Sequence, residues 1–230
     1  MSIEQNIKVA VDAVVFGYTD NQLQVLLIKQ KYGQQKGNWA LPGGFVQDKE
    51  SLKVAVLREL KEETGVEANY IEQLYTFGDD VDRDKRARVI SVSYLALLNP
   101  SNYILKATTD AIDAKWHHID DLPKLAYDHN KIIPKGLERL KAKIIYQPIG
   151  FELLDALFPF SDLENLYQTI LDKKIDRRNF RKKILSFDIL KETSKIQNIG
   201  SGRPARLYKF NKAKYKALEK EGFIFDIKLA

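Results

Sequence analysis

The stretch from Gly43 to Val66 constrains the fold more than any other part of the chain, because a glycine pair stands a few residues before an acidic run with helical spacing. Apolar residues recur at intervals of three and four over 50–64, which predicts a helix there, and Gly65 stands where a C-cap is expected. Arg58, four residues before Glu62, is expected to neutralise only that flank. At about 100° per residue, the helix places three carboxylates on one face: Glu59, Glu62 and Glu63.

Three like charges on one helix face repel one another by a few tenths of a kcal/mol per pair. A bound divalent cation would turn this repulsion into attraction, and oxygen ligands suit Mg²⁺ or Mn²⁺. We expect the glycine pair to form a turn with unusual backbone angles, from which a backbone carbonyl reaches the cation. The alternative is a solvated acidic helix face that holds no metal.

The whole run is similar to the signature of the Nudix hydrolases: Gly44, five residues, Glu50, seven residues, then the residues 58–66. The resemblance implies an α/β/α sandwich around a mixed sheet. It implies Glu59, Glu62 and Glu63 as metal ligands, with the Gly44 carbonyl joining them. Arg58 is then expected to orient a carboxylate, and Glu50 to support the geometry of loop and helix. The implied reaction is attack of water on the diphosphate of a nucleoside diphosphate derivative. The proton acceptor is Glu59 or a carboxylate outside the signature.

The charged segment 79–92 is similar to one found in many ADP-ribose-binding Nudix domains. Arg is the natural bidentate partner of a phosphate, so the candidate ligand contacts are Arg83, Arg86 and Arg88. The alternative is a purely solvated loop, since 78–88 is too charged to be core. For His129 we expect a contact at the start of a helix, and for His117 and His118 ordinary positions at a strand end.

Strand patterns occur at 9–16, 23–28, 71–77 and 89–98, with a turn at 17–21 and a further helix over 120–143. Strands mixed with two or so helices, without regular alternation, indicate an α+β domain and not a doubly wound sheet. The chain has no cysteine, which excludes disulfides, thiolate zinc sites and thiol nucleophiles. It shows neither a signal peptide nor a membrane-spanning run, so we expect a cytoplasmic protein with no membrane partner.

Charge divides the chain into two parts. Residues 1–146 carry 20 Lys and Arg against 20 Asp and Glu, whereas residues 147–230 carry 17 against 11. Within 173–216 there are 15 basic residues and 3 acidic ones. We therefore expect two domains, 1–146 and 147–230, with a polyanion as the partner of the second. A solvated basic face is the alternative.

The basic region has the pattern of a winged helix-turn-helix. A helix is expected to begin near Ser161 as its N-cap, and a second, strongly basic helix to follow Asp176, with Phe180 and Ile184 on its buried side. The Gly-rich segment 199–210 has the pattern of a wing beside the DNA backbone or minor groove. The candidate DNA contacts are Arg177, Arg178, Asn179, Arg181, Lys182, Arg203 and Arg206.

This arrangement resembles the Nudix-related transcriptional regulators, which include repressors of NAD metabolism and a sugar-responsive branch. The resemblance implies a homodimer, a palindromic double-stranded DNA operator, and a Nudix domain that senses a nucleotide-sugar such as ADP-ribose, or a sugar. Many such regulators have a degraded signature, whereas the signature here is complete. Two hypotheses follow: a ligand-responsive regulator whose first domain binds its ligand, with or without hydrolysing it, or a metabolic Nudix hydrolase whose second domain serves dimerisation or substrate capture.

Overall fold

The computed structural model describes residues 5–107, 111–198, 204–223 and 225, and it divides into two compact units. The first comprises residues 1–19 and 23–139, and the second comprises residues 20–22 and 140–230. Within the described part of the chain, no helix is long and apolar enough to cross a membrane.

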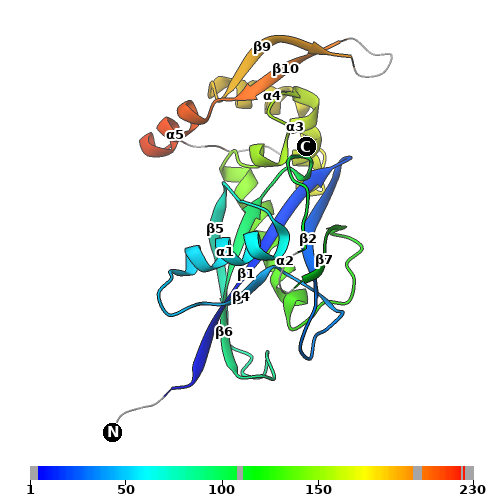
Figure 1. Cartoon of the computed structure of the whole chain (residues 1–230). Coiled ribbons are helices and arrows are strands. Elements are labelled where there is room, and N and C mark those ends of the chain that lie inside the picture. The colour runs from blue at the N-terminus through cyan, green and yellow to red at the C-terminus, as the bar shows by residue number, and fades with distance from the viewer. Residues whose placement is uncertain (1–4, 108–110, 199–203, 224, 226–230) are drawn as a thin grey trace. The chain divides into compact units, whose positions relative to one another are not determined.

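The first unit is built on one mixed seven-stranded sheet (Figure 1). The five strands of its main path run in the order β3-β2-β1-β6-β5, while β4 pairs with β1 and β7 pairs with β2. β1 and β6 are parallel over ten residue pairs, from Ile7↔Arg88 to Phe16↔Leu97. The strands are β1 (Ile7–Thr19), β2 (Gln22–Gln30), β3 (Trp39–Ala40), β4 (Gly43–Phe45), β5 (Ile71–Phe77), β6 (Arg88–Leu97) and β7 (Ala111–His118).

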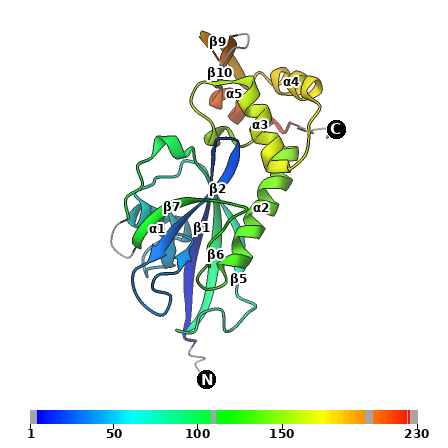
Figure 2. The ribbon, with the colours of Figure 1, turned by 90° about the vertical axis from the view of Figure 1, so that its right-hand side faces the viewer.

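Helix α1 (Leu52–Thr64) and helix α2 (His129–Tyr146) cover opposite faces of this sheet (Figure 2), and a short 3₁₀ helix, η1 (Pro100–Asn102), follows β6. Side chains alternate along β1 because successive residues of a strand point to opposite faces. The side chains of Val11, Ala13 and Val15 pack in one cluster with the apolar side of α1. Val14 points the other way, and α2 lies so close to it that a Cβ on Gly136 would come within 2.8 Å of its Cγ1. The expected α/β/α sandwich is therefore confirmed.

Two local expectations for this unit are wrong. The turn between β1 and β2 is confined to Asp20 and Asn21, both with positive φ, and Gly17 lies inside β1. Two consecutive residues with positive φ match the twist of a tight hairpin. Gly17 is required for another reason, because a side chain at this position would overlap Pro100 and Trp116.

The helix expected over 120–143 begins only at His129. The residues before it form a loop along β3: the backbone N–H of Ala126 donates to the carbonyl of Trp39 at 2.7 Å, and Tyr127 has a φ of 51°. These long-range backbone contacts take the place of helical ones, which the charge and apolar pattern of the segment did not reveal.

The second unit combines short strands and helices in winged-helix order. Its antiparallel sheet runs β8-β10-β9. Phe160, Tyr167, Phe180 and Tyr208 form an aromatic core, in which each side chain is at most 4% exposed. The elements are η2 (Phe151–Leu153), β8 (Phe158–Pro159), α3 (Phe160–Leu171), α4 (Arg177–Ser186), β9 (Leu190–Gln197), β10 (Ala205–Phe210) and α5 (Lys212–Glu221).

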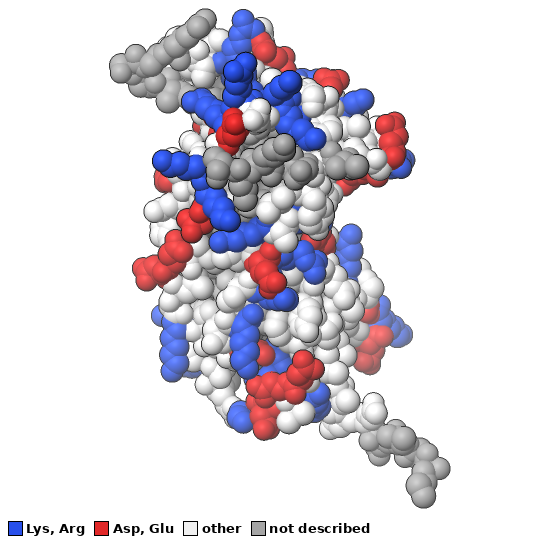
Figure 3. Space-filling model, turned by 180° about the vertical axis from the view of Figure 1, so that it is seen from behind, with Lys and Arg blue, Asp and Glu red and all other residues white. Residues whose placement is uncertain are grey.

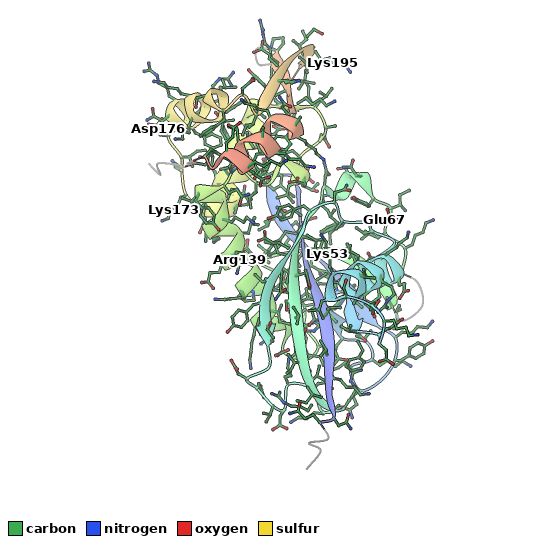
Figure 4. All side chains as sticks on the ribbon, turned by 90° about the vertical axis from the view of Figure 1, so that its left-hand side faces the viewer. Lys53, Glu67, Arg139, Lys173, Asp176 and Lys195 are labelled. Carbon is green, nitrogen blue, oxygen red and sulfur yellow. The ribbon has the colours of Figure 1, made fainter. Side chains whose placement is uncertain are left out.

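Most of the expected helix-turn-helix is confirmed. Asp176 caps α4 by accepting a hydrogen bond from the backbone N–H of Asn179 at 3.0 Å, and Phe180 and Ile184 are buried (Figure 4 labels Asp176). Ser161 is not the N-cap of α3, because the helix begins one residue earlier, at Phe160, and Pro159 occupies the N-cap position. The tip of the expected wing, residues 199–203, lies outside the described residues.

Candidate functional site

The glycine pair lies in strand β4 and not in the turn that we expected, and neither glycine has a positive φ. Instead, a close approach of side chains and backbone requires glycine at both positions. A Cβ on Gly44 would overlap the carboxylate of Glu59, and a Cβ on Gly43 would overlap the backbone carbonyl of Val11. The backbone N–H of Gly43 also donates to Oε2 of Glu63 at 2.8 Å. Strand β4 thus lies directly against the acidic face of α1.

The two glycines predict different mutational costs. Gly43→Ala places a methyl group against the backbone of β1, which cannot move cheaply, so we expect it to lower the free energy of unfolding by about 1–3 kcal/mol, with a melting temperature several degrees lower. Gly44→Ala meets the mobile end of Glu59 and is expected to lower the melting temperature less. Thermal unfolding of both variants measures the difference, and equal losses would contradict the assignment.

Arg58 joins three acidic side chains, and not only Glu62 as we expected. Its Nε and Nη2 atoms donate to both oxygens of Glu50, at 3.0 and 2.6 Å. Its Nη1 atom donates to Glu59 at 2.8 Å and to Glu62 at 3.1 Å. The hydrogen bonds from Arg58 and from the backbone N–H of Gln47 lower the pKa of Glu50 to about 2. Glu50 therefore links the loop before α1 to the helix itself, in the role that the resemblance implied.

Burial raises the pKa of Glu59 above its ordinary value, although Arg58 opposes this shift. A carboxylate that is desolvated in this way would be stabilised by a cation beside it. Glu59 and Glu63 line one cavity together with Gly44, whereas the side chain of Glu62 is 48% exposed. Among the residues that the structure describes, no three acidic or imidazole side chains surround a common point. The oxygen donors suit a divalent cation, but Glu59 and Glu62 would have to give up their hydrogen bonds to Arg58 in order to bind it.

The three candidate arginines, two in the loop after β5 and Arg88 at the start of β6, have different environments, and the loop is not simply solvated. Arg83 is buried, with 5% of its side chain exposed, and donates to both oxygens of Asp128 at 3.0 and 2.6 Å. Arg88 donates to the carbonyl of Gly78 at 2.7 Å and closes the neck of the loop. The side chain of Arg86 is about half exposed and donates hydrogen bonds to Asp84. Its guanidinium carbon lies 5.3 Å from the centre of the Phe45 ring and 5.1 Å from the centre of the Tyr127 ring.

A buried polar cluster, formed by Asp12, Arg83, Ser91, Asp128 and His129, underlies this loop. Ser91 donates to Asp12 in β1, and the backbone N–H of Leu41 donates to Nδ1 of His129 at 2.8 Å. The Nε2 atom of His129 lies 3.4 Å from Asp12. His129 therefore makes the expected contact at the start of a helix. Sequence reasoning missed Asp12; its signal was a lone carboxylate in the middle of an apolar strand.

These elements enclose a cavity of about 440 Å³. The glycine strand and the acidic helix face form one side, and the loop arginines with Tyr127 form the other. Its lining includes Asp12, Leu41, Gly43, Gly44, Phe45, Glu59, Glu63, Arg83, Asp84, Arg86, Tyr127 and His129. Carboxylates, guanidinium groups and aromatic rings converge here, as a phosphorylated ligand with a planar base would require.

The cluster also predicts how stability depends on pH. Burial alone would raise the pKa of Asp12, but His129, the hydrogen bond from Ser91 and the charge of Arg83 together lower it. Because the pKa of Asp12 is lower in the folded protein than in the unfolded chain, where it is near 4, ionised Asp12 stabilises the fold at pH values above about 4. This stabilisation is lost as the pH falls further. We expect the free energy of unfolding to fall more steeply below pH 4 in the wild type than in Asp12→Asn. Chemical denaturation at pH 2.5–6 measures this, and parallel profiles would refute the role of Asp12.

The candidate DNA contacts of the second unit fall into two groups. Arg177 binds the buried Glu164 at 2.9 Å, Arg181 donates to the hydroxyl of Tyr208 at 2.7 Å, and Arg206 pairs with Glu192. Arg178 and Lys182 are exposed on α4, and the structure gives them no ion pair within the described chain. Asn179 bonds the capping residue Asp176 at 2.7 Å, and Arg203 lies outside the described residues. Figure 3 shows Lys and Arg side chains gathered over this unit.

Comparisons with known proteins match both parts of the chain. The family model of the NUDIX domain matches residues 7–136, and that of the NrtR DNA-binding winged helix domain matches residues 150–210. The chain is 33% identical to the ADPR responsive transcriptional repressor NtrR of Acinetobacter baylyi over 204 residues, which cover 87% of this chain and 80% of the relative. It is 42% identical to the ADP-ribose pyrophosphatase of Methanocaldococcus jannaschii over 125 residues, or 54% of this chain and 70% of that enzyme.

The same relationship extends to a solved structure. The crystal structure of Shewanella oneidensis NrtR complexed with a 27mer DNA superimposes with a TM-score of 0.79 at 33% sequence identity. The match covers 96% of this chain and 99% of that one, so it includes both units.

Proposed function

The chain belongs to the NrtR family, in which a Nudix domain is joined to a DNA-binding winged helix, and we propose that it is a transcriptional repressor that responds to ADP-ribose. Residues 1–146 form the domain that binds the ligand, and residues 147–230 form the domain that binds double-stranded operator DNA. Two observations together support this most directly. Both domains match, and the chain aligns over 87% of its length with an ADPR responsive transcriptional repressor. We propose a homodimer acting in the cytoplasm.

The cavity of the first unit is the proposed ADP-ribose site. Arg86 is the arginine proposed to meet the ligand, because about half of its side chain is exposed and it lines the cavity, although it also pairs with Asp84. It lies near Phe45 and Tyr127, whose rings suit stacking with a planar base. Arg83 shapes the wall of the cavity, since its guanidinium group is held by Asp128, and Arg88 holds the loop through the carbonyl of Gly78. Glu59 and Glu63 lie on the opposite side, where the diphosphate would approach them through a divalent cation.

Release of DNA requires that ADP-ribose bind the DNA-free form of the protein more tightly than the DNA-bound form. By linkage, DNA then weakens ADP-ribose binding by the same factor, which is typically about 5–150. α2 carries His129, which lines the cavity, at its first residue and continues to Tyr146, so one helix begins at the ligand site and ends at the start of the second domain.

The test uses the purified full chain and a duplex that it selects from a random-sequence library. Fluorescence anisotropy is expected to show tight binding to the selected duplex and an affinity that falls at least fivefold in saturating ADP-ribose. In parallel, ADP-ribose is expected to raise the melting temperature more than AMP, ribose 5-phosphate or arabinose does, because a ligand that binds only the folded state stabilises it. A pentose that alone shifts the melting temperature would identify a sugar as the ligand and contradict the assignment of ADP-ribose.

A second activity, hydrolysis of the ligand, is favoured by the complete set of Glu50, Arg58, Glu59, Glu62 and Glu63 and by the likeness to an ADP-ribose pyrophosphatase. Nudix enzymes generally use divalent metal cations, and we propose Mg²⁺ or Mn²⁺ here, held by Glu59, Glu62, Glu63 and the carbonyl of Gly44. Such a cation neutralises charge on the phosphate oxygens and lowers the pKa of water. In this chain, the proton of the attacking water would pass to Glu59, which lines the cavity, or to a carboxylate outside the signature. The water oxygen would bond to one phosphorus of the diphosphate while the bond from that phosphorus to the bridging oxygen breaks. The bridging oxygen stays on the other phosphate, so the products are a nucleoside monophosphate and a sugar phosphate.

A further inference from the structure

Within the described part of the second unit, Arg181 on α4 contacts two aromatic side chains that come from two other elements. Its guanidinium carbon lies 4.5 Å from the centre of the Phe160 ring and 5.6 Å from that of Tyr208, and its Nη2 donates to the Tyr208 hydroxyl at 2.7 Å. Phe160 is the first residue of α3, Arg181 lies on α4, and Tyr208 lies on β10. One side chain therefore connects both helices of the helix-turn-helix to the sheet.

The contacts continue into the wing hairpin, by which we mean β9 and β10. The hydroxyl of Tyr208 accepts from Arg181 and donates to Oε2 of Glu192 on β9 at 3.3 Å. The other oxygen of Glu192 binds Arg206 on β10. Tyr208 and Glu192 are register partners, and the pairing is irregular between Arg206 and Tyr208. The side chains thus connect the two strands at the point where the backbone ladder is disturbed.

We infer that Arg181 is a positioning residue, which holds the wing hairpin against the recognition helix α4 and so sets the spacing of the two elements that meet DNA. This inference rests on the proposed DNA-binding function and assigns Arg181 a role different from the direct DNA contact expected from the sequence. Arg178 and Lys182 lie on the outward side of α4. In a helix of about 100° per residue, Arg178 is about 160° from the buried Phe180 and about 120° from the buried Ile184, and Lys182 is about 160° from both. These two residues remain the direct contacts.

Tyr208 provides the sharpest probe, because its side chain is 3% exposed and has no surface to offer to DNA. Tyr208→Phe keeps the ring that packs on Phe160 and removes only the hydroxyl between Arg181 and Glu192. Any loss of DNA affinity in this variant must therefore act through the position of its neighbours. A residue that touches phosphate behaves differently, because its loss also reduces the dependence of affinity on salt by about one released counterion.

The experiment measures affinity for the selected duplex at 50–300 mM salt. Tyr208→Phe and Arg181→Ala are each expected to weaken binding about 3–10-fold without changing the slope of affinity against salt. The double variant is expected to lose no more than Arg181→Ala alone, since both changes break one connection. Lys182→Gln is the contrasting variant, which is expected to weaken binding and to reduce the slope by about one.

An unchanged duplex affinity of Tyr208→Phe, even with a lower melting temperature, would overturn the inference, because the contact would then serve stability alone. A reduced salt slope of Arg181→Ala would likewise overturn it and return Arg181 to direct phosphate contact. Hydrogen exchange without DNA gives an independent result: Tyr208→Phe is expected to exchange the amides of 190–197 and 205–210 several times faster. If the wild type bound no duplex, the proposed function would fail, while faster exchange would still support the connection and identical exchange would refute it.

Discussion

Replacing Arg83 with alanine is expected to lower the free energy of unfolding by about 3–5 kcal/mol and the melting temperature by roughly 10 °C or more. The side chain of Arg83 is 5% exposed and that of Asp128 is 9% exposed, so both charges have lost most of their hydration. Removing the guanidinium leaves Asp128 without its bidentate partner and Asp12 without a positive charge 3.9 Å away. A buried carboxylate that loses its partner has no solvent to replace it.

The same substitution is expected to abolish stabilisation by ADP-ribose, because the loop carries Arg86 beside the cavity. Arg83→Lys retains the charge but not the two parallel hydrogen bonds, so an intermediate loss is expected. Lys85→Ala is the matched control: Lys85 is exposed in the same loop, and its loss is expected to change stability by less than about 0.5 kcal/mol. Thermal unfolding with and without ADP-ribose provides the measurement. If Arg83→Ala had the same melting temperature as the wild type, the ion pair between Arg83 and Asp128 would not contribute to stability.

The role of Arg83 illustrates what the sequence could not predict. A segment of alternating acids and bases is usually solvated, and the partner of Arg83, Asp128, is 45 residues away. Only the tertiary fold brings the two together, so local pattern assigns the loop to solvent. The same reason hid Asp12, whose hydrogen-bonding partner Ser91 is 79 residues distant. The sequence predicted three candidate arginines but could not separate Arg86, which is about half exposed, from Arg83, which is buried.

Features that depend on neighbouring residues were predicted well. The strand 71–77, the cap at Gly65 and the cap at Asp176 are confirmed because each depends on residues a few positions apart. The glycine pair combines a feature that nearby residues predict with one that only the tertiary fold determines. Its position before the helix was predicted, but the reason for glycine is proximity to Glu59 and to the backbone of Val11, and not a positive φ. Arg58 is similar: helical spacing indicated Glu62, whereas the loop also brings Glu50 within 2.6 Å.

Replacing Glu62 with glutamine is expected to abolish hydrolysis of ADP-ribose in Mg²⁺, with a loss of at least about 100-fold, and to leave duplex affinity largely unchanged. In the structure, Glu62 is exposed and bound to Arg58 at 3.1 Å, while Arg58 keeps both hydrogen bonds to Glu50. Losing the charge of Glu62 therefore leaves α1 and its loop in place, and the melting temperature without metal is expected to stay within about 2 °C of the wild type. The variant lacks one of the carboxylates that would release Arg58 and bind a cation in its place.

The position of Arg58 makes this prediction specific. If Glu59 and Glu62 serve only as partners of Arg58, then Glu62→Gln weakens one exposed ion pair, which is worth about 0–1 kcal/mol, and Mg²⁺ stabilises neither protein. If they bind a cation, Mg²⁺ raises the melting temperature of the wild type and not that of Glu62→Gln. Glu67→Gln is the matched control, because Glu67 pairs with Lys61 on the solvent side and is 71% exposed. Equal turnover, or an equal response to Mg²⁺, in Glu62→Gln and Glu67→Gln would remove Glu62 from the metal site and leave the first domain as a binding module.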